Sequence, residues 1–170
     1  MLWFVLGLTA AGVIILFTVS KHKSLSSLNR QCDESAANIL VFQSRRADLL
    51  DSLSSLISEY DSSGILPSLL RNVASSERSA VTVSMSEHTA ERIDELMTEV
   101  DEYTAEHDYF SSNYGYYSVR EAVSAVTQDI QNAKRKYNET SGIYNSECSK
   151  FLVKPVAKIF GFKIRDTFSI

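Results

Sequence analysis

Apolar side chains recur every three or four residues between positions 25 and 60, a spacing typical of one face of a long helix. This pattern predicts a helix of about 36 residues that packs on its neighbours as coiled-coil helices do. The expected seam consists of Leu25, Leu28, Cys32, Ser35, Ile39, Phe42, Arg46, Leu49, Leu53, Leu56 and Tyr60. The run from Asp61 to Gly64 should end this helix, and Pro67 suits the first turn of the next.

Two shorter apolar stripes follow, and each predicts one helix. The first contains Leu66, Leu69, Leu70, Val73, Ala80, Val81 and Val83 and should end between residues 84 and 89. The second contains Ile93, Leu96, Val100, Tyr103 and Phe110. Because no Gly or Pro separates the stripes, a single helix over residues 67–107 is the alternative. We favour a break, since the stripe slips by about one residue and Val81-Thr82-Val83 forms helix poorly.

The last stripe begins after residues 111–115, which read as a loop. Ser118 and Glu121 have the spacing of a capping box, so they are expected to start a helix of about 33 residues. Its seam comprises Val119, Val123, Val126, Ile130, Ala133, Tyr137, Tyr144, Cys148 and Phe151. No segment alternates as strands do. The predicted fold is all-α, an up-down-up-down bundle of four helices, with three long helices as the alternative.

The N-terminal stretch predicts a membrane anchor. Residues 2–20 carry no charge, and nineteen helical residues at ~1.5 Å each span roughly the ~30 Å core of a bilayer. A cleaved signal peptide is less consistent with the sequence, because no basic residue precedes the apolar run. Lys21, His22 and Lys23 follow it, so the positive-inside bias puts the N-terminus outside and the remaining domain in the cytoplasm, although the opposite orientation stays open. The expected division is anchor and basic flank 1–23, bundle 24–152, and basic aromatic tail 153–170.

Composition and motifs argue against several classes of function. The net charge of −4 gives no general reason to expect nucleic acid as a partner. We find no phosphate-binding loop, metal-ligand spacing or nucleophile motif, so neither an enzyme nor a cofactor is predicted. Two cysteines, Cys32 and Cys148, are too few for a disulfide framework, and whether they pair is left open.

Two charge features allow more than one interpretation. Residues 87–108 hold nine carboxylates against Arg92, which indicates either a solvated helix surface or a face that binds cations or a partner. The second interpretation gives the alternative function, a cation-dependent sensor or hydrolase. Arg46 within an apolar seam indicates either a buried ion pair or a side chain turned to the surface.

Several motifs together resemble the LemA family over residues 28–168. They are the run Arg46-Ala47-Asp48-Leu49-Leu50, then Arg135, Tyr137-Asn138 and Tyr144-Asn145, and finally Phe160-Gly161-Phe162. Leu28-Asn29 resembles a Tyr-Asn pair of that family, while Asp51 and Leu152 depart from prolines usual in it. The resemblance implies a divergent member: a single-pass protein of the bacterial inner membrane with a helical bundle, its N-terminus outside, and no established enzymatic activity.

The tail combines aromatic and basic side chains. Lys154, Lys158, Lys163 and Arg165 accompany three phenylalanines, a mixture that suits a membrane surface. The alternative is that the phenylalanines only close the end of the bundle. The function predicted from the sequence is a membrane-anchored scaffold whose partners are lipids, an unidentified protein and possible further copies of the chain.

Overall fold

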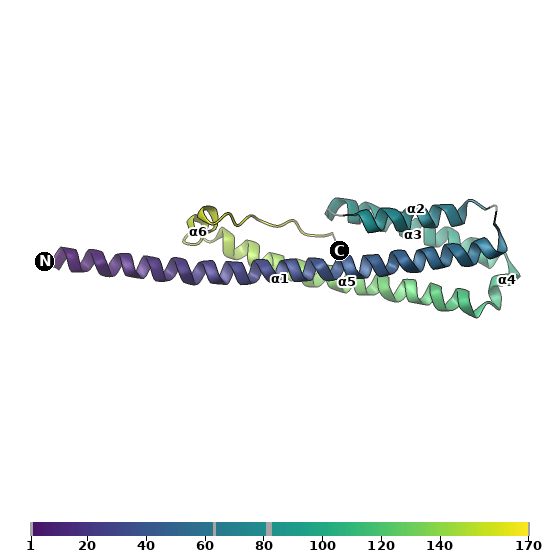
Figure 1. Ribbon diagram of the computed structural model, residues 1–170, viewed down its shortest axis with the longest axis horizontal. Helices are drawn as coiled ribbons and strands as arrows, with labels where there is room; N and C mark the ends of the chain where they lie inside the picture. Colours follow the sequence, from purple (N-terminus) through teal and green to yellow (C-terminus); the bar gives the residue numbers. More distant parts are fainter. Residues whose placement is uncertain (1, 63, 81–82, 170) are drawn as a thin grey trace. The chain divides into compact units, whose positions relative to one another are not determined.

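The computed structural model describes residues 2–62, 64–80 and 83–169, without the side chains of residues 2–6, Ala10 and Ser84. Its helices are α1 (Leu2–Tyr60), α2 (Leu66–Ser79), α3 (Val83–Ala105), α4 (Asp108–Ser111), α5 (Tyr114–Ser149) and α6 (Lys154–Ile159), as Figure 1 shows. No strand occurs in the described part of the chain. The all-helical prediction is therefore confirmed.

Helix α1 is 59 residues long and is not interrupted after the expected anchor. Between Gly12 and Gly64 the sequence contains neither Gly nor Pro, so nothing in its backbone chemistry forces a break. Its serines are accommodated by bonding to the preceding turn, as when Ser52 Oγ donates to the Asp48 carbonyl oxygen at 3.0 Å.

Among the residues that the structure describes, no helix is both long and apolar enough to cross a membrane. The expected anchor, residues 1–23, falls partly outside the description, which omits Met1 and the side chains of residues 2–6 and of Ala10.

The chain divides into two compact units, which we call unit 1 and unit 2. Unit 1 comprises Met1–Ser35 and Lys136–Thr167, and unit 2 comprises Ala36–Arg135 and Phe168–Ile170. Helices α1 and α5 each contribute to both units, since each crosses a unit boundary in sequence. Below, each unit is described by itself.

Unit 2 is a helical bundle with a continuous apolar core. The second half of α1, then α2, α3 and the first half of α5 run in alternating directions (Figure 1). The buried cluster consists of Ala47, Leu50, Leu53, Ile57, Leu70, Val73, Ala74, Ile93, Leu96, Met97, Val100, Phe110, Tyr116 and Val123. Phe42, expected in the first seam, is only partly buried, and the neighbouring Gln43 is buried in its place.

The separation of α2 from α3 bears out the predicted break, with different boundaries. Helix α2 ends at Ser79, where Ala80 becomes extended (φ −74°, ψ 96°), and α3 begins at Val83. The expected end at residues 84–89 was therefore too late. Residues 81–82, on which the weak-helix argument rested, lie outside the described residues.

The predicted capping box at Ser118 is wrong. Helix α5 begins at Tyr114, because the Asn113 side-chain oxygen accepts the Tyr116 main-chain N–H at 3.1 Å and so serves as the cap. Ser118 and Glu121 lie inside the helix. Asn and Ser are both favoured N-caps, and the pattern of residues alone gave no reason to choose the earlier one.

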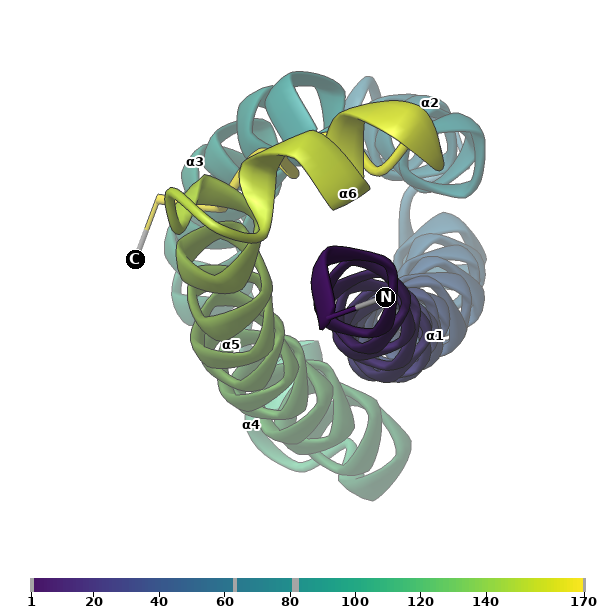
Figure 2. The same ribbon diagram turned by 90° about the vertical axis from the view of Figure 1, so that its left-hand side faces the viewer.

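Unit 1 is built from the first part of α1, the last part of α5, helix α6 and an extended segment after it. Figure 2 shows α6 following α5 and turned back toward α1. Its buried residues include Leu25, Cys32, Tyr137, Tyr144, Cys148, Val153, Val156 and Ala157. The expected tail thus begins inside a packed unit, with Val153 only 2% exposed.

Candidate functional site

Side chains of α5 hold the extended C-terminal segment of unit 1 by its main chain. Asn145 Nδ2 donates to the Arg165 carbonyl oxygen at 2.9 Å, and Asn145 Oδ1 accepts the Arg165 main-chain N–H at 2.9 Å. Tyr137, two turns earlier on α5, donates its hydroxyl to the Asp166 carbonyl oxygen at 3.1 Å. Main-chain groups of a segment outside helices and sheets need such partners when they are partly buried. We call these contacts the C-terminal clamp.

The Arg165 side chain joins the same segment to α1. Its Nη2 donates to Asn29 Oδ1 at 2.8 Å and to Asp33 Oδ1 at 2.6 Å. The guanidinium carbon lies 5.9 Å from the centre of the Tyr144 ring. Burial alone would lower the pKa of Arg165, but the hydrogen bond and charge of Asp33 raise it overall. Arg165, expected at a lipid surface, thus has its partners within unit 1.

Beneath the clamp lies a buried group of one phenol and two thiols. Tyr144 and Cys32 are fully buried, Cys148 is nearly so, and both cysteines are free. The Tyr144 hydroxyl has no hydrogen-bond partner among the described residues. Burial, and after it the neighbouring Cys148 thiol, raise the pKa of Tyr144 to about 12, and burial likewise raises the pKa of Cys32. At neutral pH the phenol and the Cys32 thiol are therefore uncharged and unreactive.

Phe160-Gly161-Phe162 ends α6 in a Schellman motif. The Phe162 N–H donates to the Ala157 carbonyl oxygen at 2.9 Å and the Gly161 N–H to that of Lys158 at 3.4 Å. Gly161 adopts φ +74°, which residues with a β-carbon rarely adopt. The Phe160 and Phe162 rings lie 4.5 and 5.7 Å from the His22 ring of α1. The Phe160-Gly161-Phe162 motif therefore ends α6 beside His22 of α1.

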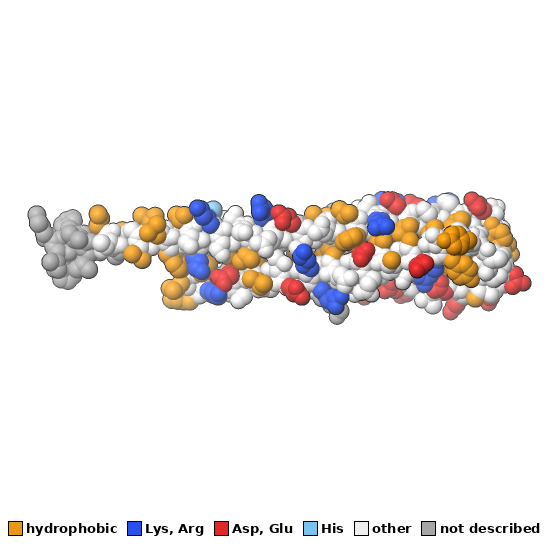
Figure 3. All heavy atoms as spheres, turned by 90° about the horizontal axis from the view of Figure 1, so that it is seen from below, with side chains coloured by type: hydrophobic (Ala, Val, Ile, Leu, Met, Phe, Trp, Pro, Cys, Tyr) orange, Lys and Arg blue, Asp and Glu red, His pale blue; other side chains and the backbone are white. Residues whose placement is uncertain are grey.

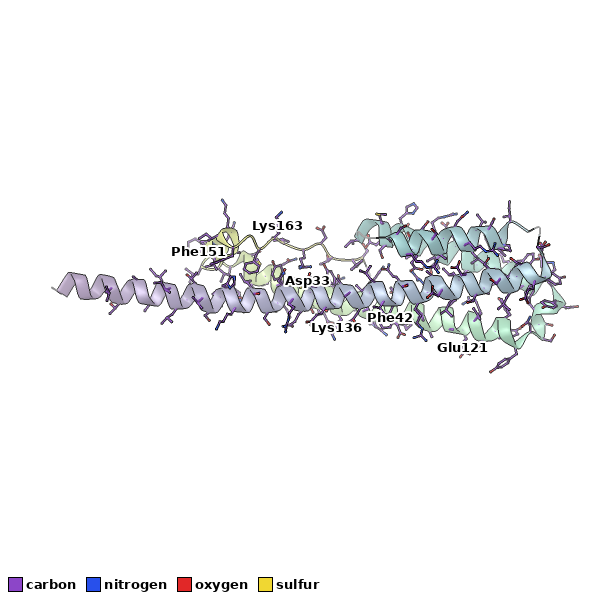
Figure 4. All side chains as sticks on the ribbon, in the orientation of Figure 1. Asp33, Phe42, Glu121, Lys136, Phe151 and Lys163 are labelled. Atoms are coloured by element: carbon purple, nitrogen blue, oxygen red, sulfur yellow. The ribbon has the colours of Figure 1, made fainter. Side chains whose placement is uncertain are left out.

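Exposed apolar and basic side chains surround α6. Phe151, Leu152, Ile159 and Ile164 are 67–88% exposed, and Lys154, Lys158 and Lys163 are exposed beside them in sequence. We call these seven residues the lysine surface. Figure 4 shows Phe151 immediately before α6 and Lys163 in the segment after it. Further exposed apolar side chains occupy α1, as Figure 3 shows beyond the grey residues: Leu8, Val13, Ile14, Ile15, Leu16, Phe17 and Val19.

Unit 2 contains a buried ion pair between Arg46 of α1 and Glu77 of α2. Two guanidinium nitrogens reach the carboxylate at 2.5–3.1 Å, and both side chains are at most 3% exposed. The ion-pair interpretation of Arg46 is thus confirmed. Burial raises the pKa of Glu77 even though Arg46 opposes that rise. Nearby, burial lowers the pKa of Lys134, whose ammonium lies 5.1 Å from the centre of the Phe168 ring.

Glu77 was missed by the sequence analysis, although a signal existed. It lies seven residues after Leu70 and four after Val73, on the same apolar stripe of α2. A carboxylate at a seam position is the natural partner for an arginine at another seam position.

The remaining family positions have structural contacts. Asp48 receives Arg78 Nη2 at 2.8 Å on the outside of the bundle, and Leu49 packs against its core. Arg135 donates to the Asn132 side chain, and the Asn138 carbonyl oxygen accepts the Ser141 hydroxyl at 3.2 Å. The family motif therefore falls into two groups, one in each unit.

The acidic stretch 87–108 lies on α3 and the start of α4. Within the described part of the chain, no three His, Cys, Asp or Glu side chains gather closely enough to hold a metal ion. Some carboxylates have protein partners instead: Glu95 pairs with Arg92 at 2.9 Å, Asp101 with Arg120 at 2.6 Å, and Glu87 accepts the Ser169 N–H at 2.5 Å.

These features define an all-helical protein with a buried ion pair in one unit and a clamped C-terminal segment in the other. The family model described as LemA family matches residues 35–170, most of the chain, and the protein belongs to this family. A comparison with curated proteins found no significant match.

The two buried tyrosines on α5 allow a matched test of the clamp. Tyr144→Phe should raise the free energy of unfolding by about 1 kcal/mol, because it removes a buried hydroxyl without a protein partner. Tyr137→Phe should lower it by about 1 kcal/mol, because the Asp166 carbonyl loses its donor. Chemical denaturation at pH 7 measures both, and equal effects of the same sign would contradict this description.

The burial of Tyr144 also predicts how the free energy of unfolding depends on pH. The Tyr144 pKa is about 12 in the folded protein, whereas a phenol in the unfolded chain titrates near 10. Above about pH 10 the unfolded chain therefore releases this proton more readily than the folded one, and Tyr144 lowers the free energy of unfolding increasingly as the pH rises toward 12. Tyr144→Phe should make stability fall less steeply across that interval.

The buried ion pair should show strong coupling. Arg46→Met and Glu77→Leu should each lower the free energy of unfolding by about 3–5 kcal/mol, because each leaves the other charge buried and unpaired. The double variant should regain most of that loss, since no unpaired charge remains. Additive losses in a denaturation double-mutant cycle would show that the two side chains act independently.

Proposed function

We propose that this LemA-family chain is a single-pass, membrane-anchored helical scaffold whose unit 1 contacts lipid and whose unit 2 contacts protein. The observation that carries the proposal is the number of exposed apolar side chains in unit 1, on α1 and around α6, with lysines beside those around α6. Large exposed apolar patches on a protein commonly mark sites of membrane or protein contact.

The chemistry of residues 1–23 supports an anchor. Residues 2–20 lack charge, and their helix continues without interruption into the lysine-containing flank. Lys21 and Lys23 favour a cytoplasmic location for the residues that follow, with the N-terminus outside. The inner membrane of a bacterial cell is the proposed location.

Charge separates the two units in a way that suits this division of roles. Unit 1 contains nine basic and five acidic residues and so carries +4, whereas unit 2 contains eight basic and sixteen acidic residues and carries −8. Anionic lipid attracts the first and repels the second. A scaffold is favoured over an enzyme because the Arg46–Glu77 pair and the contacts of Asn145 and Tyr137 hold segments of the chain together.

The anchor is tested with the full-length chain in bacterial membranes. The protein should remain in the membrane pellet after alkaline carbonate extraction, and protease added outside intact right-side-out vesicles should leave its C-terminus uncut. Ile14→Lys with Phe17→Lys should release it, since each charge costs about 3 kcal/mol inside a bilayer.

A matched control is available on the same helix. Leu40→Lys with Val41→Lys changes two exposed apolar side chains of α1 beyond the flank, so extraction should be unchanged. Release of the wild-type chain by carbonate would contradict the anchor.

The lysine surface predicts a lipid-dependent change in α6. With the full chain in bilayers, amide hydrogen exchange in residues 154–159 should be slower when the lipid is anionic than when it is zwitterionic. Lys154→Gln, Lys158→Gln and Lys163→Gln together should abolish the difference, because each lysine contributes about 1 kcal/mol near anionic lipid. Arg135→Gln with Lys136→Gln, exposed on α5, is the control that should retain it.

A further inference from the structure

Unit 2 has an aromatic surface to which neither the bundle core nor the proposed membrane contact gives a role. Four tyrosines contribute to it: Tyr60 at the end of α1, Tyr109 in α4, and Tyr114 and Tyr117 in the first turn of α5. They are 44%, 44%, 86% and 53% exposed. We call them the tyrosine surface. Figure 3 shows hydrophobic side chains beside acidic ones at this end of unit 2.

Most of these rings are held in place by other rings. Tyr60 stacks on Tyr109 with centroids 4.9 Å apart and planes 20° apart, and both meet the buried Phe110 ring edge-on. Phe110 in turn contacts Tyr116, and Tyr116 contacts Tyr117, at 5.4 and 5.5 Å. Rigid tyrosines offer a large contact area at a low cost in side-chain entropy. The surface is therefore pre-organised for binding.

The charge around these rings is mostly negative. The segments that carry them, residues 59–61 and 99–121, contain eight carboxylates and one basic side chain, Arg120. Arg120 pairs with one of these carboxylates, because its Nε and Nη2 donate to Asp101 at 2.8 and 2.6 Å. The other seven carboxylates have no basic side chain within these segments. Such a surface attracts cationic partners and repels anionic lipid and nucleic acid.

A hollow adjoins the tyrosines. Its volume is about 280 Å³, and its lining includes Asp101, Asp108, Tyr117 and Arg120. This is below the ~300–1,000 Å³ typical of sites for drug-sized ligands, so it suits a single long side chain. A guanidinium in it would have the Asp108 carboxylate to pair with, since Arg120 already pairs with Asp101, and the Tyr117 ring to stack on. A planar guanidinium does both better than an ammonium group does.

We propose that the tyrosine surface binds an arginine-bearing basic segment of a partner protein, with one arginine side chain in the hollow beside Asp108. The inference rests on the proposed scaffold function and specifies the chemistry of its protein partner. The carboxylates draw the basic segment in, and the rings distinguish arginine from lysine.

The test uses the full chain in zwitterionic nanodiscs and three short fluorescent peptides in which Arg, Lys or Glu alternates with Gly and Ser. Anisotropy should show binding of the arginine peptide, binding about tenfold weaker for the lysine peptide, and none for the glutamate peptide. Tyr109→Ala, Tyr114→Ala and Tyr117→Ala together should remove the preference for arginine. The corresponding three Phe substitutions should keep it, since they keep the rings.

Controls separate this surface from the rest of the chain. Leu40→Ala with Val41→Ala, exposed on α1, should bind as the wild type does, and melting curves establish that the Ala and Phe variants fold. Glu106→Gln with Asp108→Asn should weaken the arginine and lysine peptides together, because it removes attraction common to both. The lipid-dependent exchange of α6 should be unchanged in every tyrosine variant, so that failure here is distinct from failure of the membrane role.

Three outcomes would overturn the proposal. They are equal affinity of the wild type for the arginine and lysine peptides, a preference for arginine that survives the triple Ala variant, and self-association that the triple Ala variant abolishes. The last would show that a second copy of the chain occupies the surface. Sedimentation velocity of the wild type and the variant in detergent detects it.

Discussion

The hydrogen bonds between Asn145 and the main chain of Arg165 are the constraint on which unit 1 depends. Residues 163–169 form neither helix nor sheet, so their main-chain groups have no regular partners. One amide side chain satisfies both groups of one residue, and Tyr137 satisfies the next carbonyl. With the segment fixed there, the Arg165 guanidinium reaches Asn29 and Asp33 of α1. These few bonds therefore tie the segment after α6 to both α5 and α1.

Unit 2 depends on a different kind of polar contact. Arg46 and Glu77 are buried among apolar residues, where replacement by well-packed apolar side chains often costs little stability. We expect their value to lie in alignment, because a charge pair in a low-dielectric core is best satisfied in one register. We expect the pair to fix α2 against α1, while the surrounding leucines and valines supply most of the burial energy.

The helices could be predicted from the sequence because their signals are local. Apolar spacing located residues 25–60 of α1 and also α2, α3 and α5, and the absence of Gly and Pro explains the full length of α1. Contacts between segments distant in sequence were harder to predict. Asn113 and Ser118 are comparable caps, so the choice between them depended on packing at the start of α5. Arg165 read as a lipid contact because nothing local reveals Asp33, 132 residues away.

Part of the candidate site was also visible in advance. The paired motifs Tyr137-Asn138 and Tyr144-Asn145 stood out, but their shared role required the extended segment to be placed. Glu77 could have been found from its position on an apolar stripe. The tyrosine surface could not, since Tyr60, Tyr109 and Tyr117 come from three elements whose approach depends on the turns between them.

The two buried thiols of unit 1 allow the opening of this unit to be measured. Cys32 and Cys148 are free and buried, so an alkylating reagent reaches them only when the surrounding structure opens. If opening and closing are fast, the labelling rate reports the equilibrium population of open molecules, and if closing is slow it reports the opening rate itself. The alkylation rate of Cys32 and Cys148 therefore measures the opening of unit 1 in the chain without substitutions, in detergent or in a bilayer.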